Sequence, residues 1–135
     1  MQTSTIGDQI NQKVDIQQVG TDFVNYFYNN LKTNLQELVN SGLLRNHTRI
    51  KYMNKEYKGN ELIQLLLQLS QEINFIIEEN IIMDSGGRRA DILTSGKIQS
   101  LKTQEMFSFS QYFTIANNKD GKWFLHNSLL SILKC

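Results

Sequence analysis

The chain has 135 residues, of which 40% are hydrophobic, which is enough for one buried core and too few for two. Its 14 basic and 13 acidic residues give a formal net charge of +1, so it has no excess of positive charge to neutralise nucleic-acid phosphates or anionic lipid. The single cysteine, Cys135, excludes an internal disulfide and a zinc site made of cysteines. No apolar run approaches the roughly 20 residues of a membrane span, and the first residues do not resemble a secretory signal. We therefore expect one soluble domain over residues 1–135 in the cytoplasm or nucleus, with residues 1–5 a candidate for disorder.

The first part of the chain carries apolar residues at helical spacing. From Ile6 to Tyr28 they recur every three or four positions, which predicts one long amphipathic helix with Phe23 and Phe27 on its buried side. Gly20 is expected to mark a bend. The polar residues of the first turns indicate that burial is deeper from Phe23 onwards.

A short helix, a hairpin and a third helix are expected next. Thr33 and Gln36 resemble a capping box, in which side chains satisfy the first backbone amides of a helix. Polar and apolar residues alternate on both sides of a turn over residues 48–57, which predicts a small hairpin. The leucine-rich segment that follows predicts a helix capped by Asn60 and ending near Gln71.

The rest of the chain is predicted to be extended. Four strands are expected over residues 73–83, 90–101, 107–115 and 122–133, separated by turns that contain glycine or asparagine. Gly96 is expected to lie at a bulge. Helices followed by a meander of long antiparallel strands indicate the α+β class, so the helices should pack on one face of a curved sheet.

The last strand has large apolar residues on both of its faces. A period of two places Leu125 and Leu129 on one face and Phe124 and Leu130 on the other, and the helices can cover only one of these faces. We therefore expect the other face to bind a protein through an interface of roughly 1,200 to 2,000 Å². The alternative is that bulges rotate some of these residues into the core. The expected partner-binding residues are Leu125, Asn127, Leu129, Ser131, Ile98 and Ser100.

Several segments, in this order of elements, resemble the nuclear transport factor 2 family. They are DFVNYFY over residues 22–28, the pattern F-x-Q-x-F over residues 109–113, and the glycine and tryptophan at Gly121 and Trp123. The opening F-V-N-x-x-Y resembles the NXT-type small subunit of the messenger-RNA export receptor. The resemblance covers nearly the whole chain. It implies a cone-shaped fold in which three helices pack on a strongly bent, mostly antiparallel sheet.

The resemblance also implies a non-catalytic subunit in nucleocytoplasmic transport. An NXT-type protein would pack its open sheet face against a larger messenger-RNA export receptor and would offer a shallow apolar site to phenylalanine-glycine repeats of nuclear-pore proteins. It would act in the nucleus and cytoplasm, at the nuclear pore. The family's arginine in the final strand is replaced here by Ser131, so the pairing is expected to depend on the sheet surface rather than on one ion pair.

A second function implied by the resemblance is a homodimeric carrier for nuclear import of Ran-GDP. Such a carrier is expected to use acidic residues in the loop before the F-x-Q-x-F strand. Either alignment of this loop places other residue types there, namely Leu101 and Thr103, or Lys102 and Gln104. Glu105 is the only carboxylate nearby. The sequence therefore favours the export subunit over the Ran carrier.

A third function is that of an enzyme with its site inside the cone. Some relatives use a buried carboxylate or histidine whose pKa is shifted by an apolar cavity. His126 has no carboxylate partner that the sequence makes evident, and a glutamine can neither gain nor lose a proton. We therefore predict no catalytic residue, metal or cofactor, and no direct binding of nucleic acid or membrane. The expected cavity-lining residues are Phe23, Phe27, Phe109, Gln111 and Phe113.

Overall fold

Three helices pack on a single sheet in the computed structural model, which describes residues 15–118 and 121–134. The expected helix start at Ile6 and the candidate disorder of residues 1–5 lie outside the described residues. No helix in the described part is long and apolar enough to cross a membrane. The helices are α1 (Ile16–Thr33), α2 (Leu35–Asn40) and α3 (Gly59–Glu72).

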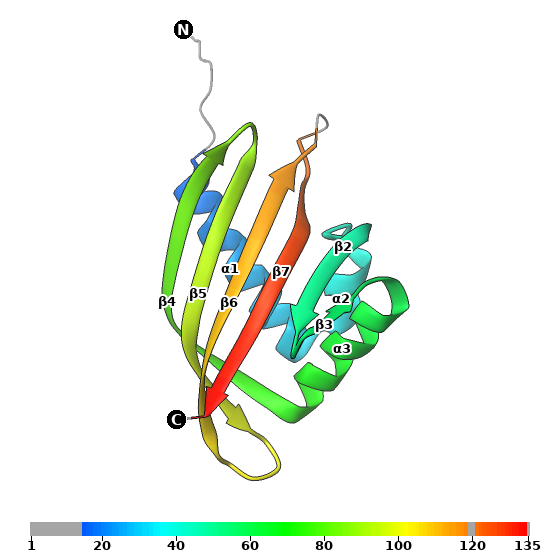
Figure 1. Ribbon diagram of the computed structural model, residues 1–135. Coiled ribbons are helices and arrows are strands. Elements are labelled where there is room, and N and C mark those ends of the chain that lie inside the picture. Colours follow the sequence, from blue (N-terminus) through cyan, green and yellow to red (C-terminus); the bar gives the residue numbers. More distant parts are fainter. Residues whose placement is uncertain (1–14, 119–120, 135) are drawn as a thin grey trace, which may run out of the picture.

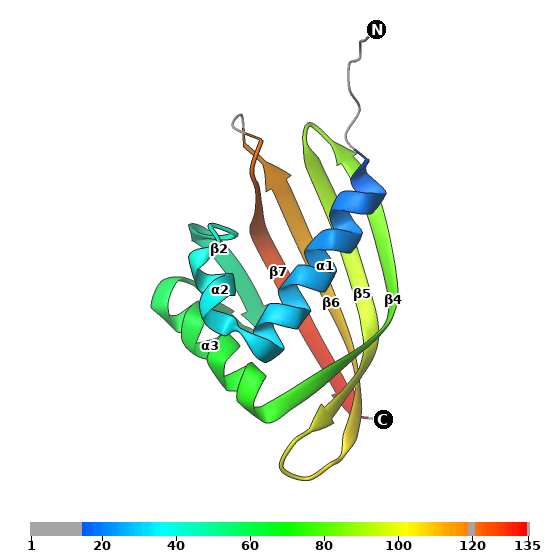
Figure 2. The ribbon, with the colours of Figure 1, turned by 180° about the vertical axis from the view of Figure 1, so that it is seen from behind.

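Six strands form one mixed sheet in the order β3-β2-β7-β6-β5-β4. Neighbouring strands are antiparallel except β2 and β7, which are parallel. Figure 2 shows α1 running diagonally across one face of the bent sheet, which we call the inner face, while Figure 1 looks onto the opposite, uncovered face. The predicted α+β architecture is confirmed. The strands are β2 (Leu44–Tyr52), β3 (Lys55–Tyr57), β4 (Ile73–Gly86), β5 (Arg89–Ser100), β6 (Met106–Asn117) and β7 (Trp123–Lys134).

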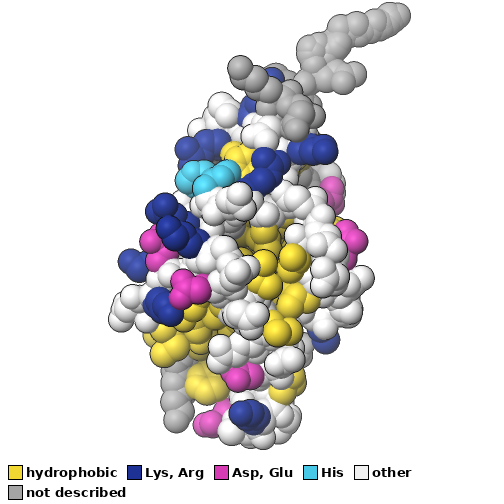
Figure 3. All heavy atoms as spheres, turned by 90° about the vertical axis from the view of Figure 1, so that its right-hand side faces the viewer, with side chains coloured by type: hydrophobic (Ala, Val, Ile, Leu, Met, Phe, Trp, Pro, Cys, Tyr) yellow, Lys and Arg dark blue, Asp and Glu magenta, His cyan; other side chains and the backbone are white. Residues whose placement is uncertain are grey.

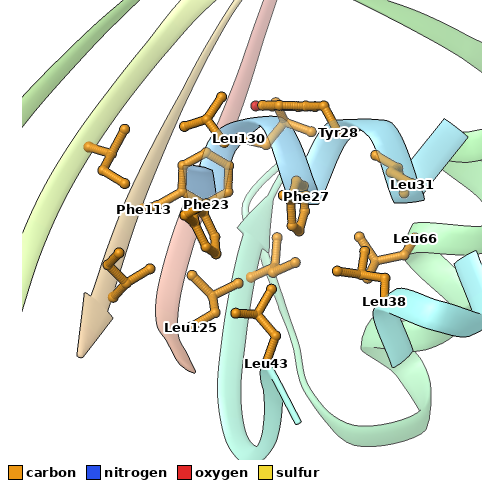
Figure 4. Close-up of a cluster of buried hydrophobic side chains, with 14 of the residues drawn as sticks. Phe23, Phe27, Tyr28, Leu31, Leu38, Leu43, Leu66, Phe113, Leu125 and Leu130 are labelled. Carbon is orange, nitrogen blue, oxygen red and sulfur yellow. The ribbon is translucent and has the colours of Figure 1, made fainter. Parts of the chain in front are cut away.

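The core forms where α1 packs against the inner face. The rings of Phe23 and Phe27 meet the ring of Phe113 in β6 edge to face, with centroids 5.0 and 5.2 Å apart. Figure 4 shows these rings among leucine side chains from all three helices and from β7. Leu38 of α2 and Leu66 of α3 are 0% and 1% exposed, so the two shorter helices close the core from the side.

α1 approaches β4 closely at Gly20. A Cβ atom there would lie 2.7 Å from a side-chain carbon of Ile82, so glycine provides the clearance between helix and strand. One turn earlier, Gln17 donates from Nε2 to the carbonyl oxygen of Ile82 at 2.8 Å. The helix is continuous through Gly20, and the absence of a side chain there allows this close packing; the expected bend stays a prediction.

Two helix starts differ from the predicted caps. Asn34 is the N-cap of α2, and its side-chain oxygen accepts from the Glu37 backbone N–H at 3.2 Å. The hydroxyl of Thr33 donates instead to a backbone oxygen of α1, so the expected capping box is wrong. α3 begins after Lys58 without a side-chain cap, and Asn60 lies within its first turn. α3 is therefore stabilised mainly by its buried leucines.

A bulge interrupts the pairing of β4 and β5 at Gly96. Ile77 pairs with Gly96, and the register then skips Glu78, which is an extra residue in β4. A Cβ atom at Gly96 would lie 2.0 Å from the carbonyl oxygen of Ile76, so no larger residue fits without a backbone shift. The predicted irregularity at Gly96 is confirmed, with the extra residue in the neighbouring strand.

Candidate protein-binding surfaces

The uncovered face carries a row of apolar side chains across four strands. Ile81 of β4 pairs with Leu93 of β5. Tyr112 of β6 lies between Leu93 and Leu129 of β7. Ile81, Leu93 and Leu129 are 47%, 41% and 48% exposed. We call these four residues the apolar row, and exposed apolar groups that are contiguous in this way are typical of a protein-binding surface.

Polar groups border the apolar row and are held in place by hydrogen bonds. The carboxylate of Asp91 accepts from Ser85 and, at 2.9 Å, from Thr114. Burial alone would raise the pKa of Asp91, but these bonds, a further one from Tyr112 and the nearby charge of Arg89 outweigh burial and lower it. Asp91 is therefore a fixed negative charge beside the apolar row at neutral pH.

The predicted partner-binding residues divide between the two faces of the sheet. Asn127, Leu129 and Ser131 lie on the uncovered face. Ile98 is 2% exposed and Ser100 shares its side of β5, so both belong to the inner face and their assignment to the outer one is wrong. Alternation along β5 predicts two faces, but it does not tell which of them the helices cover.

Leu125 was also expected on the uncovered face, but it is 0% exposed and lies in the core. A bulge in β7 explains the error. Thr114 pairs with Asn127, whereas the next residue, Ile115, pairs with Leu125, so His126 is an extra residue. The alternation shifts by one at this point, which is the alternative that the sequence left open.

The predicted cavity-lining residues lie together in the interior and are between 0% and 6% exposed. The polar groups among them are satisfied, because Gln111 accepts from the Tyr28 hydroxyl at 2.6 Å and donates to Ser128 Oγ at 3.1 Å. Burial raises the pKa of Tyr28 well above its usual value. The described residues contain no cluster of three or more histidine, cysteine or acidic side chains that could hold a metal ion. These interior residues are Phe23, Phe27, Phe109, Gln111 and Phe113.

A hollow of about 550 Å³ opens beside the loop between β5 and β6. Tyr52 and Phe107 are among its apolar lining residues, and Glu72 and Lys102 are among the charged ones. Burial above all, and then the nearby Tyr57 and Glu72, raise the pKa of Tyr52. The loop in which a Ran carrier is expected to place acidic residues borders this hollow, and it contributes Lys102, Thr103 and Glu105.

A groove of about 310 Å³ lies between α1 and the segments that begin β7 and precede β2. Val19, Leu43 and Trp123 give it apolar walls. Tyr26 also lines it and donates its hydroxyl to Glu37 of α2 at 2.6 Å. Figure 3 shows hydrophobic side chains gathered near the middle of the side of the molecule formed by β2, α2 and α3. The sequence predicts a shallow apolar site but does not identify the residues that form it. The signal that could have identified them is the wide apolar stripe of α1, to which Val19 and Tyr26 belong.

The three helices and the six-stranded mixed sheet define an α+β fold of the NTF2-like type. Among solved structures with this fold, nuclear transport factor 2 from Cryptosporidium parvum superposes with a TM-score of 0.74 at 21% sequence identity, over 87% of this chain and 94% of that chain. The sequence itself matches no protein-family model and no curated protein.

Two further structures show that this fold serves different functions. A putative ketosteroid isomerase from Shewanella frigidimarina has a TM-score of 0.73 at 14% identity, over 89% of this chain and 100% of its own. A chain in the complex of the yeast deubiquitinase Ubp3 with its cofactor Bre5 has a TM-score of 0.70 at 10% identity, over 89% of this chain and 98% of its own. Identities this low show the fold alone, so function has to be argued from the surfaces.

Proposed function

We propose that this protein is a non-catalytic, protein-binding subunit of nucleocytoplasmic transport that pairs with a larger messenger-RNA export receptor. The apolar row carries the proposal, because its leucine and isoleucine side chains would otherwise stay about half exposed to water. Packing the uncovered face against a second sheet would bury roughly 1,200 to 2,000 Å² in total, the usual size of a specific interface. The complex would act in the nucleus and cytoplasm, at the nuclear pore.

The surroundings of Ser131 support pairing through apolar area rather than through an ion pair. Along β7, Ser131 lies on the uncovered face between Leu129 and Leu133, which are 48% and 68% exposed. An interface centred on these leucines gains stability from the apolar area that it removes from water. A larger partner with an apolar sheet face of its own would therefore fit this surface.

The groove beside α1 would receive the phenylalanine side chain of a phenylalanine-glycine repeat. Apolar walls from Val19, Leu43 and Trp123 would surround the ring, and the volume of about 310 Å³ is at the small end of ligand pockets. A single ring in a shallow groove gives weak and quickly reversible binding, which suits repeated contacts during transport through the pore.

The Ran-GDP carrier and the cavity enzyme are the alternative functions. The likeness to nuclear transport factor 2 favours the carrier, but among the loop residues that line the hollow Glu105 is the one acid and Lys102 is basic, whereas a carrier is expected to use more than one acidic residue there. The likeness to a ketosteroid isomerase favours an enzyme. Against it, Tyr28 is the only titratable side chain among the buried residues of the described part, and its raised pKa keeps it protonated at neutral pH.

Native mass spectrometry of the complexes that contain this chain tests the proposal. We expect one copy of the chain bound to one larger protein. A homodimer that is retained on immobilised Ran-GDP would favour the carrier instead. A chain that stays monomeric at micromolar concentration in the presence of cell extract would contradict pairing through the uncovered face.

A further inference from the structure

A group of cationic and aromatic side chains lies at one end of the uncovered face, outside the apolar row. The guanidinium carbon of Arg45 lies 4.5 Å from the centre of the Phe124 ring. The His47 ring meets the same phenylalanine edge-on at 5.3 Å and lies 5.8 Å from the His126 ring. Figure 3 shows histidine in cyan beside several lysine and arginine side chains. We call Arg45, together with His47 and His126, the cationic cluster, because the guanidinium of Arg45 carries a permanent positive charge.

The cationic cluster lies where the pairing between β2 and β7 is irregular. The register between β2 and β7 jumps at this point, so that residues 45–48 oppose the single residue His126. Thr48 stabilises this shift in register, because its hydroxyl donates to the Leu125 carbonyl oxygen at 2.6 Å and accepts from the Arg45 backbone N–H at 2.8 Å. Bulges of this kind redirect side chains and are frequent at functional sites.

The cationic cluster offers hydrogen-bond donors that are held in position. Arg45 donates from Nε to the Gly42 carbonyl oxygen at 2.9 Å. With the Asn118 amide in the orientation that gives both of its atoms partners, Arg45 also donates to the Asn118 side-chain oxygen, from Nη1 at 2.7 Å and from Nη2 at 3.3 Å. Further guanidinium N–H groups stay available. Asn127 donates from Nδ2 to Nδ1 of His126 at 3.2 Å. An amide nitrogen can only donate, so Nδ1 of His126 accepts this bond and the ring N–H at Nε2 can be donated to a ligand.

No carboxylate neutralises the cationic cluster in the described part of the chain. The ion pairs found there join Arg49 to Glu56 and Lys55 to Glu61, both at 3.5 Å, and neither Arg45 nor a histidine forms one. The stack on the phenylalanine ring fixes the guanidinium without neutralising its charge. The site is therefore electropositive and pre-organised, which suits an anion.

We propose that the cationic cluster binds a phosphate monoester on a phosphorylated side chain of a partner protein. Such a group carries a charge of about −1.5 to −2 at neutral pH and three acceptor oxygens, which match the guanidinium and imidazole donors.

A metal ion does not fit, because Nε2 of His126 carries its proton and Arg45 would repel a cation. RNA fits less well, because its phosphodiesters carry single charges along a strand and a chain with a net charge of +1 provides no extended basic track. The proposal does not depend on pairing through the apolar row.

Histidine NMR spectra of the full chain test this site directly, since the chain contains only two histidines. The probe is a short glycine peptide that carries one phosphoserine. We expect saturable shifts of both ring signals as the peptide is added. His47→Asn and His126→Asn should each weaken binding about tenfold, the usual effect of losing one charge-assisted hydrogen bond. Lys55→Gln removes a cation elsewhere on the surface and should leave the affinity unchanged.

Two further probes decide between the possible outcomes. The same peptide without phosphate should shift neither histidine signal. Equal shifts with both peptides, or unchanged affinity in a folded His126→Asn variant, would show that no phosphate site exists. An oligouridylate with hydroxyl ends carries only phosphodiesters and should bind more weakly than the phosphopeptide. Tighter binding of the oligouridylate would make the ligand RNA and overturn the proposal.

Discussion

Leu129→Glu places a carboxylate in the apolar row, at the centre of the proposed interface. In the complex this carboxylate would leave water against an apolar partner surface that offers it no counter-charge, and burying a charge in this way costs about 3–5 kcal/mol. A loss of about 4 kcal/mol corresponds to roughly a thousandfold weaker pairing. The substitution is therefore expected to abolish the complex at micromolar concentrations.

The isolated chain should tolerate the same substitution. Full burial of a leucine contributes roughly 1.5–3 kcal/mol. Leu129 is 48% exposed, so the substitution can remove only about half of this contribution. Lys51 of β2 is its neighbour in the register, and attraction between opposite charges in adjacent strands would offset part of the loss. The free energy of unfolding should fall by about 1 kcal/mol or less.

Leu67→Glu is the matched control. Leu67 lies on α3, away from the uncovered face, and is 39% exposed, so the same chemical change is made outside the proposed interface. Light scattering after size-exclusion chromatography measures pairing, and urea unfolding measures stability. Retained pairing in Leu129→Glu, or equal loss in Leu67→Glu, would refute the proposed interface. Unfolding of the isolated Leu129→Glu chain would show that this leucine belongs to the core.

Three further substitutions test other parts of the structure. Gly96→Ala would bring a Cβ atom within 2.0 Å of the Ile76 carbonyl oxygen. The free energy of unfolding, measured in urea, should therefore fall by about 3 kcal/mol. A fall of less than about 1 kcal/mol would show that the strand can shift to make room. Asp91 has a lowered pKa in the folded state, so its carboxylate stabilises the fold above the unfolded-state pKa, and this stabilisation is lost as the pH falls through the folded-state pKa. Asp91→Asn should therefore lower the free energy of unfolding at about pH 7 but not at about pH 2. An equal loss at both pH values would contradict this role of Asp91. Trp123 is the only tryptophan, so a phenylalanine-glycine peptide in the groove should change its fluorescence, and Val19→Asp should abolish that change; a change that persists would place the peptide elsewhere.

The elements themselves were predictable because their signals are local. The hairpin expected over residues 48–57 is formed by β2 and β3, with Met53 and Asn54 at positive φ in its turn. The period of two in β6 correctly separates buried Phe113 from the half-buried Tyr112. Each of these features depends on residues close together in sequence, so one chain without relatives is sufficient to predict it.

The two faces of the sheet were not predictable, because they depend on contacts between distant segments. Leu125 lies in the core only because β7 contains a bulge at His126. That bulge is stabilised by the hydroxyl of Thr48, which bonds to the Leu125 carbonyl oxygen from 77 positions away. A strict period of two predicts the wrong face for every residue on one side of such a bulge.

The residues of the groove beside α1 could not be predicted from the sequence for the same reason. It joins Val19 from the first helix to Trp123 from the last strand, with Leu43 between them. Each of these residues is consistent with a core position when its own element is considered alone. Only the folded chain shows that α1 has more apolar surface than the sheet covers.

The interior bears on function because the NTF2-like fold is shared by nuclear transport factor 2 and a putative ketosteroid isomerase. Proton-transfer chemistry would need a group inside the cone that can exchange a proton at neutral pH. Here Gln111 occupies the centre, and its amide is bonded on both sides, to Tyr28 and to Ser128. Tyr28 itself stays protonated because burial raises its pKa. The exposed apolar surface of the described chain is on its outside, in the apolar row and the groove, where the proposed partners would pack.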